Sequence, residues 1–272
     1  MLHSKIIIYR HWQAGFVALS FFHMIQTPPL PSLEWCLFLD VDGTLIEFTD
    51  TPIETHADSK IKALLAAAAE SLGGALALVS GRSIECLDAL FEPLRLPVAG
   101  LHGVERRGAT GAVHGSIFTD AQLDLPRRAI KALVAAHPGT SLEDKGRTIA
   151  IHYRQSPQSE RILRDSLAAI AAPLGAHYHI QDGNMVLEIK PSGFTKATAI
   201  AAFLAEPPFR GRMPVFVGDD LTDEDGFRVV EEKGGISIAV GDRVRGQYNV
   251  ENAAAVRQWL EGIAAMTGLH RE

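Results

Sequence analysis

The stretch Trp35-Cys36-Leu37-Phe38-Leu39-Asp40-Val41-Asp42-Gly43-Thr44 is an apolar run that stops on one carboxylate and continues to a second. An apolar run bounded in this way predicts a buried β-strand with Asp40 and Asp42 at its end. Residues two apart in an extended chain point to the same side, so the two carboxylates should repel each other. A cation bound between them would relieve that repulsion, and we therefore expect a metal site at the end of this strand.

Composition and charge narrow the class of protein. The chain has 272 residues, 47% of them apolar and 21% charged, so it can bury a substantial core in one large or two ordinary domains. A formal net charge of −6 argues against a general nucleic-acid binder or an anionic-membrane binder. The two cysteines, Cys36 and Cys86, provide no disulfide framework or zinc ligand set. We expect both to be small buried hydrophobes, which fits a reducing cytoplasm.

Residues 1–31 differ from the rest of the chain. Their apolar stretches are interrupted by Arg10, His11 and Gln13 and are too short to span a bilayer. We expect a flexible arm, or a start codon placed too early with Met24 as the true start. The alternative is an export or membrane signal, but a small-residue cleavage site is lacking.

The order of apolar and helical stretches predicts the architecture. Residues 32–105 alternate strand, helix, strand, helix, strand, and the alternation resumes in residues 191–272. This order predicts an α/β fold with a doubly wound, Rossmann-like parallel sheet. Residues 106–190 instead mix hairpin turns with two helices, which predicts a small α+β module inserted into the sheet domain.

Three predicted strands end on a polar residue: Asp40, Ser80 and Asp219. Ligands of open parallel sheets bind at the carboxyl ends of the strands, so these residues should meet at one edge. Oxygen ligands without nearby thiolates favour a hard cation, Mg²⁺ before Ca²⁺ or zinc. The acidic residues available to it are Asp40, Asp42, Asp219, Asp220 and Asp223.

Such a site suits phosphate chemistry. Ser80 and Lys196 can donate hydrogen bonds to phosphate oxygens. A carboxylate beside Mg²⁺ can attack phosphorus and form an aspartyl-phosphate, which divides one difficult displacement into two easier ones. A second carboxylate can protonate the leaving alcohol and later activate water.

Four elements in this order resemble the motifs of the haloacid-dehalogenase-like phosphatases, and the resemblance covers residues 36–266. The elements are Asp40-Val41-Asp42-Gly43-Thr44, Ser80, Lys196 and Gly218-Asp219-Asp220. The resemblance implies that Asp40 is the nucleophile and Asp42 the general acid/base. It implies that Ser80, Gly81 and Lys196 hold the phosphate. The implied Mg²⁺ ligands are Asp40, Asp42 through its backbone carbonyl, Asp219 and Asp223.

Longer motifs resemble the trehalose-6-phosphate phosphatase family. They are Val79-Ser80-Gly81-Arg82, Gly100-Leu101-His102-Gly103-Val104-Glu105, Glu188-Ile189-Lys190-Pro191-Ser192-Gly193, residues 218–225, and the module segments Glu143-Asp144-Lys145-Gly146 and His152-Tyr153-Arg154. This resemblance implies that the inserted module is a cap that recognises the sugar. Lys145 and Glu188 are its best matches to sugar-contacting positions, and His102 and Arg147 are weaker ones. One departure is Ala197, where the family usually has glycine.

Several of these residues also have a structural interpretation. Asp223 and Asp225 lie where a carboxylate caps a helix. Asp220 could orient Thr44 or a loop amide. His102 could be a satisfied loop histidine, and Lys145 could be a solvated charge in a hairpin turn.

We therefore expect a Mg²⁺-dependent enzyme that hydrolyses trehalose 6-phosphate, a soluble monomer that binds a small sugar phosphate and neither nucleic acid nor membrane. The nearest alternative is another capped phosphatase, acting on sucrose phosphate or mannosyl-phosphoglycerate. A phospho-accepting receiver also uses clustered aspartates, a hydroxyl and a lysine, but the inserted module and Asp42 argue against it. A catalytically silent binding domain is the third alternative.

Overall fold

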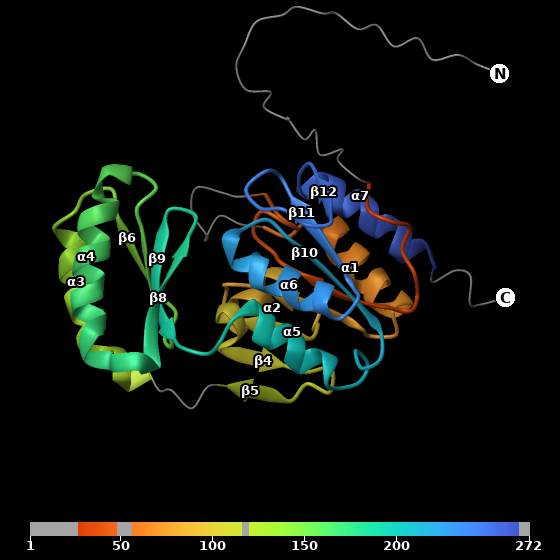
Figure 1. Cartoon of the computed structure of the whole chain (residues 1–272), viewed down its shortest axis with the longest axis horizontal. Coiled ribbons are helices and arrows are strands. Elements are labelled where there is room, and N and C mark those ends of the chain that lie inside the picture. Colours follow the sequence, from red (N-terminus) through yellow and green to blue (C-terminus); the bar gives the residue numbers. More distant parts are fainter. Residues whose placement is uncertain (1–26, 48–55, 116–119, 267–272) are drawn as a thin grey trace, which may run out of the picture.

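The computed structural model describes residues 27–47, 56–115 and 120–266. It consists of a larger body around one sheet and a smaller body around another (Figure 1). This confirms the predicted α/β fold with an inserted α+β module. The smaller body is called the cap below, and the larger one the core.

The core sheet has eight strands in the order β12-β11-β10-β1-β2-β3-β4-β5. The strands are β1 (Trp35–Leu39), β2 (Leu76–Val79), β3 (Val98–Gly100), β4 (Glu105–Arg107), β5 (Val113–Gly115), β10 (Met213–Gly218), β11 (Ile236–Val240) and β12 (Tyr248–Val250). All neighbours from β12 to β3 are parallel. The chain builds outward from β1 in one direction and from β10 in the other, so β1 and β10 flank the switch point where ligands bind.

Helices cover both faces of this sheet. They are α1 (Ser59–Ser71), α2 (Ile84–Phe91), α5 (Lys196–Leu204), α6 (Glu224–Glu232) and α7 (Ala253–Ala264). α1 packs on α7, and α5 packs on α6 across the sheet from them (Figure 1). β1 is therefore enclosed on both sides, and its five residues are all buried, which explains why its sequence is continuously apolar.

The hairpin of β4 and β5 corrects one predicted boundary. We expected residues 106–116 to begin the inserted module, but β4 pairs antiparallel with β3 and so extends the core sheet. The pairing of a hairpin depends on its neighbour in space, which a local glycine-rich pattern does not specify. We therefore propose that the cap begins after residue 115.

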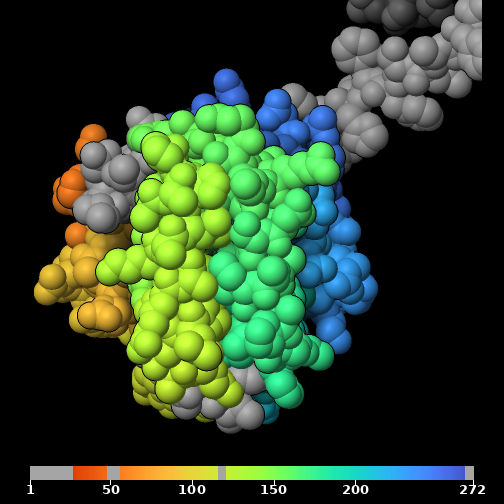
Figure 2. All heavy atoms as spheres, turned by 90° about the vertical axis from the view of Figure 1, so that its left-hand side faces the viewer, coloured from red at the N-terminus to blue at the C-terminus, as the bar shows by residue number. Residues whose placement is uncertain are grey.

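The cap sheet has four antiparallel strands in the order β6-β7-β9-β8, with α3 and α4 on its outer face (Figures 1 and 2). Its elements are β6 (Ser141–Asp144), β7 (Ile149–His152), β8 (Tyr178–Gly183), β9 (Val186–Pro191), α3 (Asp124–Ala135) and α4 (Glu160–Ala171). The short helical turns are η3 (Asp120–Leu123), η4 (Pro157–Ser159) and η5 (Ala172–His177).

The two faces of the cap sheet differ in chemistry because side chains alternate along each strand. Leu187 and Ile189 of β9 join the apolar cluster under the cap helices. Glu188 and Lys190 alternate with them along the strand, so their side chains lie on the opposite face, which is turned to the core. Gln181 of β8 is the cross-strand partner of Glu188 on that face. The cap therefore presents a polar surface to the carboxyl edge of the core sheet.

Most of the predicted arm lies outside the described residues, and the prediction is not tested there. Its end contacts α7, where the Trp259 indole N–H donates to the Pro29 carbonyl at 3.2 Å. One expectation about the periphery is wrong. Cys86 is exposed, not buried, because the buried stripe of α2 is made by Ile84, Leu87 and Phe91. None of the helices in the described ranges has the length and apolar character needed to cross a bilayer.

Candidate active site

Three buried carboxylates gather where β1 and β10 end. Asp40 follows β1 and Asp219 follows β10, and the backbone N–H of Asp40 donates to the Val217 carbonyl at 3.0 Å, which fixes the two ends side by side. Asp223 completes the group, here called the core cluster. One carboxylate oxygen from each residue lies within 4.8 Å of the other two.

A tight turn places Asp223. Its side chain accepts hydrogen bonds from the backbone N–H groups of Asp219 and Asp220, at 3.1 and 3.0 Å, across the turn η6 (Leu221–Asp223). A Cβ at Gly218 would collide with the Asp223 carboxylate, so this approach requires glycine. Asp223 thus acts as a capping residue and still keeps its other oxygen in the core cluster, so capping does not exclude the predicted role as a metal ligand.

Lys196 opens α5 and reaches into this cluster. Its Nζ lies 2.7 Å from Asp40 Oδ1 and 2.6 Å from Asp223 Oδ1. A Thr195–Thr198 capping box starts the helix and holds the lysine at that position. Burial alone would lower the pKa of Lys196, but the carboxylates of Asp223 and Asp40 outweigh it and the net shift is upward.

The core cluster carries more negative charge than its lysine can neutralise. Burial raises the pKa of Asp40 well above its usual range and that of Asp219 to about 7, with Asp223 reinforcing both shifts. Burial also raises the pKa of Asp223. Thr44 adds a hydroxyl 3.2 Å from Asp219 Oδ1 and 3.4 Å from Asp40 Oδ2. An excess of buried carboxylate oxygen without sulfur or nitrogen ligands fits a hard divalent cation.

Asp42 does not share this cluster. Its carboxylate receives two hydrogen bonds from Arg82, from Nε and Nη2, both at 2.7 Å. β1 ends at Leu39, so the chain is no longer an extended strand between Asp40 and Asp42. The prediction that the two carboxylates point the same way is therefore wrong, and Arg82 supplies the compensating charge for Asp42.

The loop after β2 joins the core to the cap. Ser80 is buried, and its Oγ accepts a hydrogen bond from the Arg82 backbone N–H at 3.1 Å. The carbonyl of Gly81 accepts a hydrogen bond from Nζ of Lys145 in the cap, also at 3.1 Å. Lys145 therefore reaches across the interface to the predicted phosphate loop.

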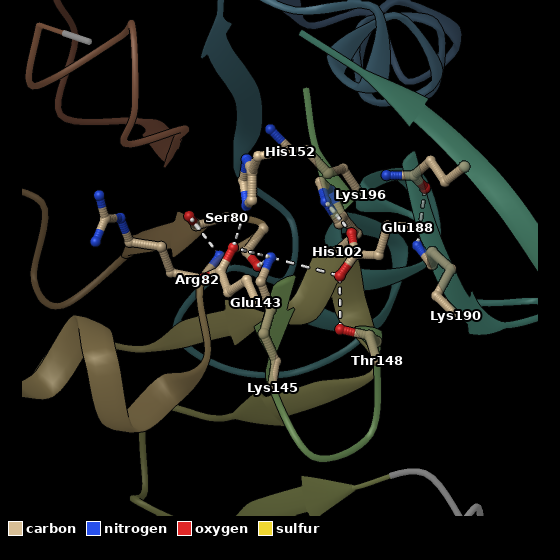
Figure 3. Close-up of polar contacts among 12 residues, drawn as sticks. Ser80, Arg82, His102, Glu143, Lys145, Thr148, His152, Glu188, Lys190 and Lys196 are labelled. Atoms are coloured by element: carbon tan, nitrogen blue, oxygen red, sulfur yellow. Dashed lines mark hydrogen bonds and ion pairs between the residues drawn. The ribbon is translucent and has the colours of Figure 1, made fainter. Parts of the chain in front are cut away.

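Lys145 also organises a charged group on the cap, here called the cap cluster: Glu143, Lys145 and Glu188 (Figure 3). Its Nζ lies 3.4 Å from Glu188 Oε1 and 3.6 Å from Glu143 Oε2. Thr148 donates to Glu188 at 2.6 Å, and His152 lies 2.8 Å from Glu143. Burial would raise the pKa of both glutamates, but these partners outweigh it and both values are lowered.

His102 meets the cap from the core side. Its Nε2 lies 3.4 Å from Glu188 Oε2, and its ring rests against the backbone of Gly81, where a Cβ would collide with it. Leu101 and His102 have φ values of 51° and 53°, in the left-handed region, which costs about 1–3 kcal/mol for each residue. Burial lowers the pKa of His102 to about 4, so the ring is neutral at neutral pH.

The structure separates the other candidates from this group. Arg147 lies against Gly115 at the edge of the core sheet. Asp220 caps η6 and pairs with Arg243 at 3.0 Å, while Thr44 contacts Asp219 and Asp40 instead. Asp225 is exposed and pairs with Arg228.

Two functional candidates were missed by sequence reasoning. Arg82 follows Ser80-Gly81 at a strand end, and Glu143 lies two residues before Lys145 on the same hairpin. Each was visible in a quoted motif, but only the fold shows that Arg82 binds Asp42 and that Glu143 shares Lys145 with Glu188.

Comparison with known proteins identifies a family and several relatives that the chain resembles. The sequence model of the trehalose-phosphatase family matches residues 38–257. The trehalose-6-phosphate phosphatase of Escherichia coli is 42% identical over 92% of this chain and 93% of its own length. A probable trehalose-phosphate phosphatase of Sinorhizobium fredii is 40% identical over 85% of this chain and 88% of its own.

A solved structure agrees. The crystal structure of a trehalose-6-phosphate phosphatase related protein is 25% identical, with a TM-score of 0.73, and the match covers 87% of this chain and 99% of that one.

Proposed function

The chain belongs to the trehalose-phosphatase family, and on that premise we propose that it hydrolyses trehalose 6-phosphate to trehalose and inorganic phosphate. The observation that carries the proposal is the contact between two chemically distinct clusters. The core cluster, with Lys196, suits phosphoryl transfer, and the cap cluster, with its charged oxygens and ammonium, suits a polyhydroxylated sugar. Lys145 ties them together through the Gly81 carbonyl.

In the first half of the reaction, Asp40 attacks the phosphorus atom and the bond to the sugar oxygen breaks. Asp42 transfers a proton to that oxygen, which leaves as a hydroxyl of trehalose. In the second half, Asp42 takes a proton from water, and the water attacks the aspartyl-phosphate. Phosphate then leaves, and Asp40 and a protonated Asp42 are restored.

The residues of the core cluster fit Mg²⁺. Asp40, Asp219 and Asp223 would hold it, with the backbone carbonyl of Asp42 as a further ligand. When bound, Mg²⁺ supplies positive charge to the phosphate and opposes the effect of burial on the carboxylates. Lys196, Ser80 and Gly81 of the chain itself would bind the phosphate oxygens.

Sugar recognition falls to the cap in this proposal. Glu188 is buried and Lys145 is half-buried, and both are charged and fixed by neighbours, so they can orient sugar hydroxyls with little loss of side-chain entropy on binding. Glu143 shares Lys145 and belongs with them. Arg147 stays a weaker prediction because it lies away, against Gly115.

We further propose a cytoplasmic monomer. Both cysteines of the chain are free, which suits a reducing compartment. Sedimentation or size-exclusion chromatography with light scattering tests the monomer.

The substrate proposal is tested by phosphate release from a panel of sugar phosphates with and without Mg²⁺. The panel contains trehalose 6-phosphate, sucrose 6-phosphate, glucose 6-phosphate and mannosyl-phosphoglycerate, with an aryl phosphate as a probe of the core alone. We expect Mg²⁺-dependent release with the highest kcat/KM for trehalose 6-phosphate. A higher kcat/KM for another member would reassign the substrate, and release from none would refute a phosphatase.

A further inference from the structure

Glu105, the first residue of β4, reaches the first turn of α2. Its Oε1 accepts a hydrogen bond from the backbone N–H of Ile84 at 2.5 Å. Ile84 is the first residue of α2, so its N–H has no partner within the helix. Glycine at position 100 permits this approach, since a Cβ there would lie 2.9 Å from the Glu105 oxygen and from the Ile84 nitrogen. The proposed reaction gives this contact no role.

β4 is attached to α2 at two points. Glu105 and Arg107 are two residues apart on the strand and point to the same side. Arg107 forms two hydrogen bonds with the carboxylate of Asp88, farther along α2, both at 2.7 Å. Arg107 therefore anchors the body of the helix, whereas Glu105 fixes its first residue.

Arg82 lies two residues before Ile84, in the loop that leads from β2 to α2. Its side chain donates two hydrogen bonds to the Asp42 carboxylate, from Nε and Nη2, both at 2.7 Å. A carboxylate has about four lone-pair positions, so the others stay free for the proton that Asp42 passes to the sugar oxygen and later takes from water. Arg82 can therefore hold the orientation of Asp42 throughout the reaction.

The backbone around Arg82 is fixed at two points by the residues that follow β3. The Leu101 N–H donates to the Arg82 carbonyl at 2.9 Å, and the Glu105 carboxylate holds Ile84. Without the second contact the end of α2 can shift and turn the Arg82 guanidinium. A displacement of about 1 Å at a reacting group can cost about 100-fold in rate. The position of Asp42 thus depends on Glu105 through Arg82.

We propose that Glu105 is a positioning residue for proton transfer: it fixes the first turn of α2, which sets Arg82, and Arg82 orients Asp42. The inference rests on the proposed function, since it requires a phosphate ester whose leaving oxygen takes a proton from Asp42. It applies to any sugar phosphate, because it concerns the leaving oxygen and not the identity of the sugar.

Two substitutions at position 105 test the hydrogen bond. Glu105→Ala removes the acceptor of the Ile84 N–H, and Glu105→Gln keeps a side-chain oxygen at the same reach. Arg107→Gln is the matched control, since it loosens the contact of β4 with α2 away from the loop. Circular dichroism and thermal melting check folding. If Glu105→Ala does not fold, Glu105→Asp replaces it, because the aspartate side chain is one methylene shorter.

With trehalose 6-phosphate we expect Glu105→Ala to lose about 10- to 100-fold in kcat, with KM within about threefold of the wild type. Glu105→Gln and Arg107→Gln should both keep kcat within about threefold of the wild type. In an Arg82→Ala background, Glu105→Ala should cause little further loss, because its effect passes through Arg82.

A second substrate, p-nitrophenyl phosphate, separates proton transfer from a general loss of structure. p-Nitrophenolate leaves without a proton, so the first half of the reaction does not need Asp42, whereas the attack of water still does. In stopped-flow mixing at high enzyme concentration, Glu105→Ala should release the first equivalent within about threefold of the wild-type rate. Its later turnover should be about 10- to 100-fold slower than that of the wild type.

An unchanged kcat in Glu105→Ala, an equal loss in either Gln variant, a slowed first equivalent, or independent losses in the double variant would overturn the positioning role. Failure of the proposed function looks different. The wild type would then prefer another sugar phosphate, and the same comparison with that substrate would still decide the role of Glu105. Phosphate release from none of the esters would overturn both proposals.

Discussion

The core cluster is buried and the cap cluster is partly buried, and both are charged, yet the pKa values of their carboxylates shift in opposite directions. In the core cluster three carboxylates share one ammonium, and the carboxylate pKa values rise. In the cap cluster two carboxylates share Lys145 and hydrogen bonds from Thr148 and His152, and their pKa values fall. The first is incomplete without an added cation, whereas the second is compensated by its own residues. We therefore expect that metal binding at the core cluster and sugar recognition at the cap cluster can be separated by substitution.

Replacing Asp40 by Asn should cause the largest loss of activity, through the core cluster. The variant keeps the size of the side chain but removes the proposed nucleophile, so we expect kcat to fall about 10⁴-fold or more. Asp165→Asn, on the exposed surface of the cap helix α4, is the matched control and should keep full activity. Turnover of Asp40→Asn near the wild-type rate would contradict the assignment of the nucleophile.

Replacing Lys145 by Met should disrupt the cap cluster and lower activity toward the sugar phosphate. Glu188 then loses the ammonium group beside it, so we expect kcat/KM for trehalose 6-phosphate to fall about 10²-fold. Hydrolysis of an aryl phosphate should fall much less, because the core cluster is untouched. Steady-state kinetics with both substrates test this, and an equal loss with both would mean that the two clusters are not separable.

Adding Mg²⁺ should stabilise the protein through the core cluster alone. At 100 times its dissociation constant, a ligand that binds only the folded state contributes about 2.7 kcal/mol, which is a rise in Tm of several degrees. The rise should disappear in Asp219→Asn and persist in Glu188→Gln, as differential scanning fluorimetry can show. A rise that survives Asp219→Asn would place the cation elsewhere.

The smallest expected effect is a difference in pH dependence. Asp219 has a folded pKa raised to about 7 from a usual value near 4, so without metal its contribution to stability is largest at low pH and is lost as pH rises through 7. The lowered pKa values of Glu143 and Glu188 act in the opposite sense, and their contribution is lost only in acid, as pH falls below about 4.

Urea unfolding in EDTA between pH 5 and 8 isolates the core effect. We expect Asp219→Asn to remove about 1–2 kcal/mol of the pH-dependent change in the free energy of unfolding, and Asp165→Asn to leave it unchanged. Identical pH profiles for Asp219→Asn and the wild type would contradict the origin assigned to the shift.

Much of the core could be predicted from the sequence because its signals are local. The apolar run ending at Asp40 specified β1, and the similar run ending at Asp219 specified β10. Parallel strands bring their carboxyl ends to one edge, so the meeting of Asp40, Asp219 and Lys196 followed from the fold class and the motifs. The predicted ligand Asp223 also lies in this cluster.

What could not be predicted depends on partners distant in the sequence. Arg82 binds Asp42 although the two residues are 40 positions apart, and no local pattern predicts the pairing. The β4–β5 hairpin looks the same whether it joins the core or the cap, since only β3 decides its sheet. β12 was missed because it is a short edge strand of three residues with mixed polarity.

The segment from β9 into α5 has a consequence for engineering. Glu188, in the cap, and Lys196, which contacts the core cluster, both lie on the segment in which the chain passes from β9 back to α5. A graft that brings in a foreign cap to change substrate preference therefore needs a splice point between these two residues. The capping box at Thr195 and Thr198, which sets the position of Lys196, marks the downstream limit of any exchangeable cassette.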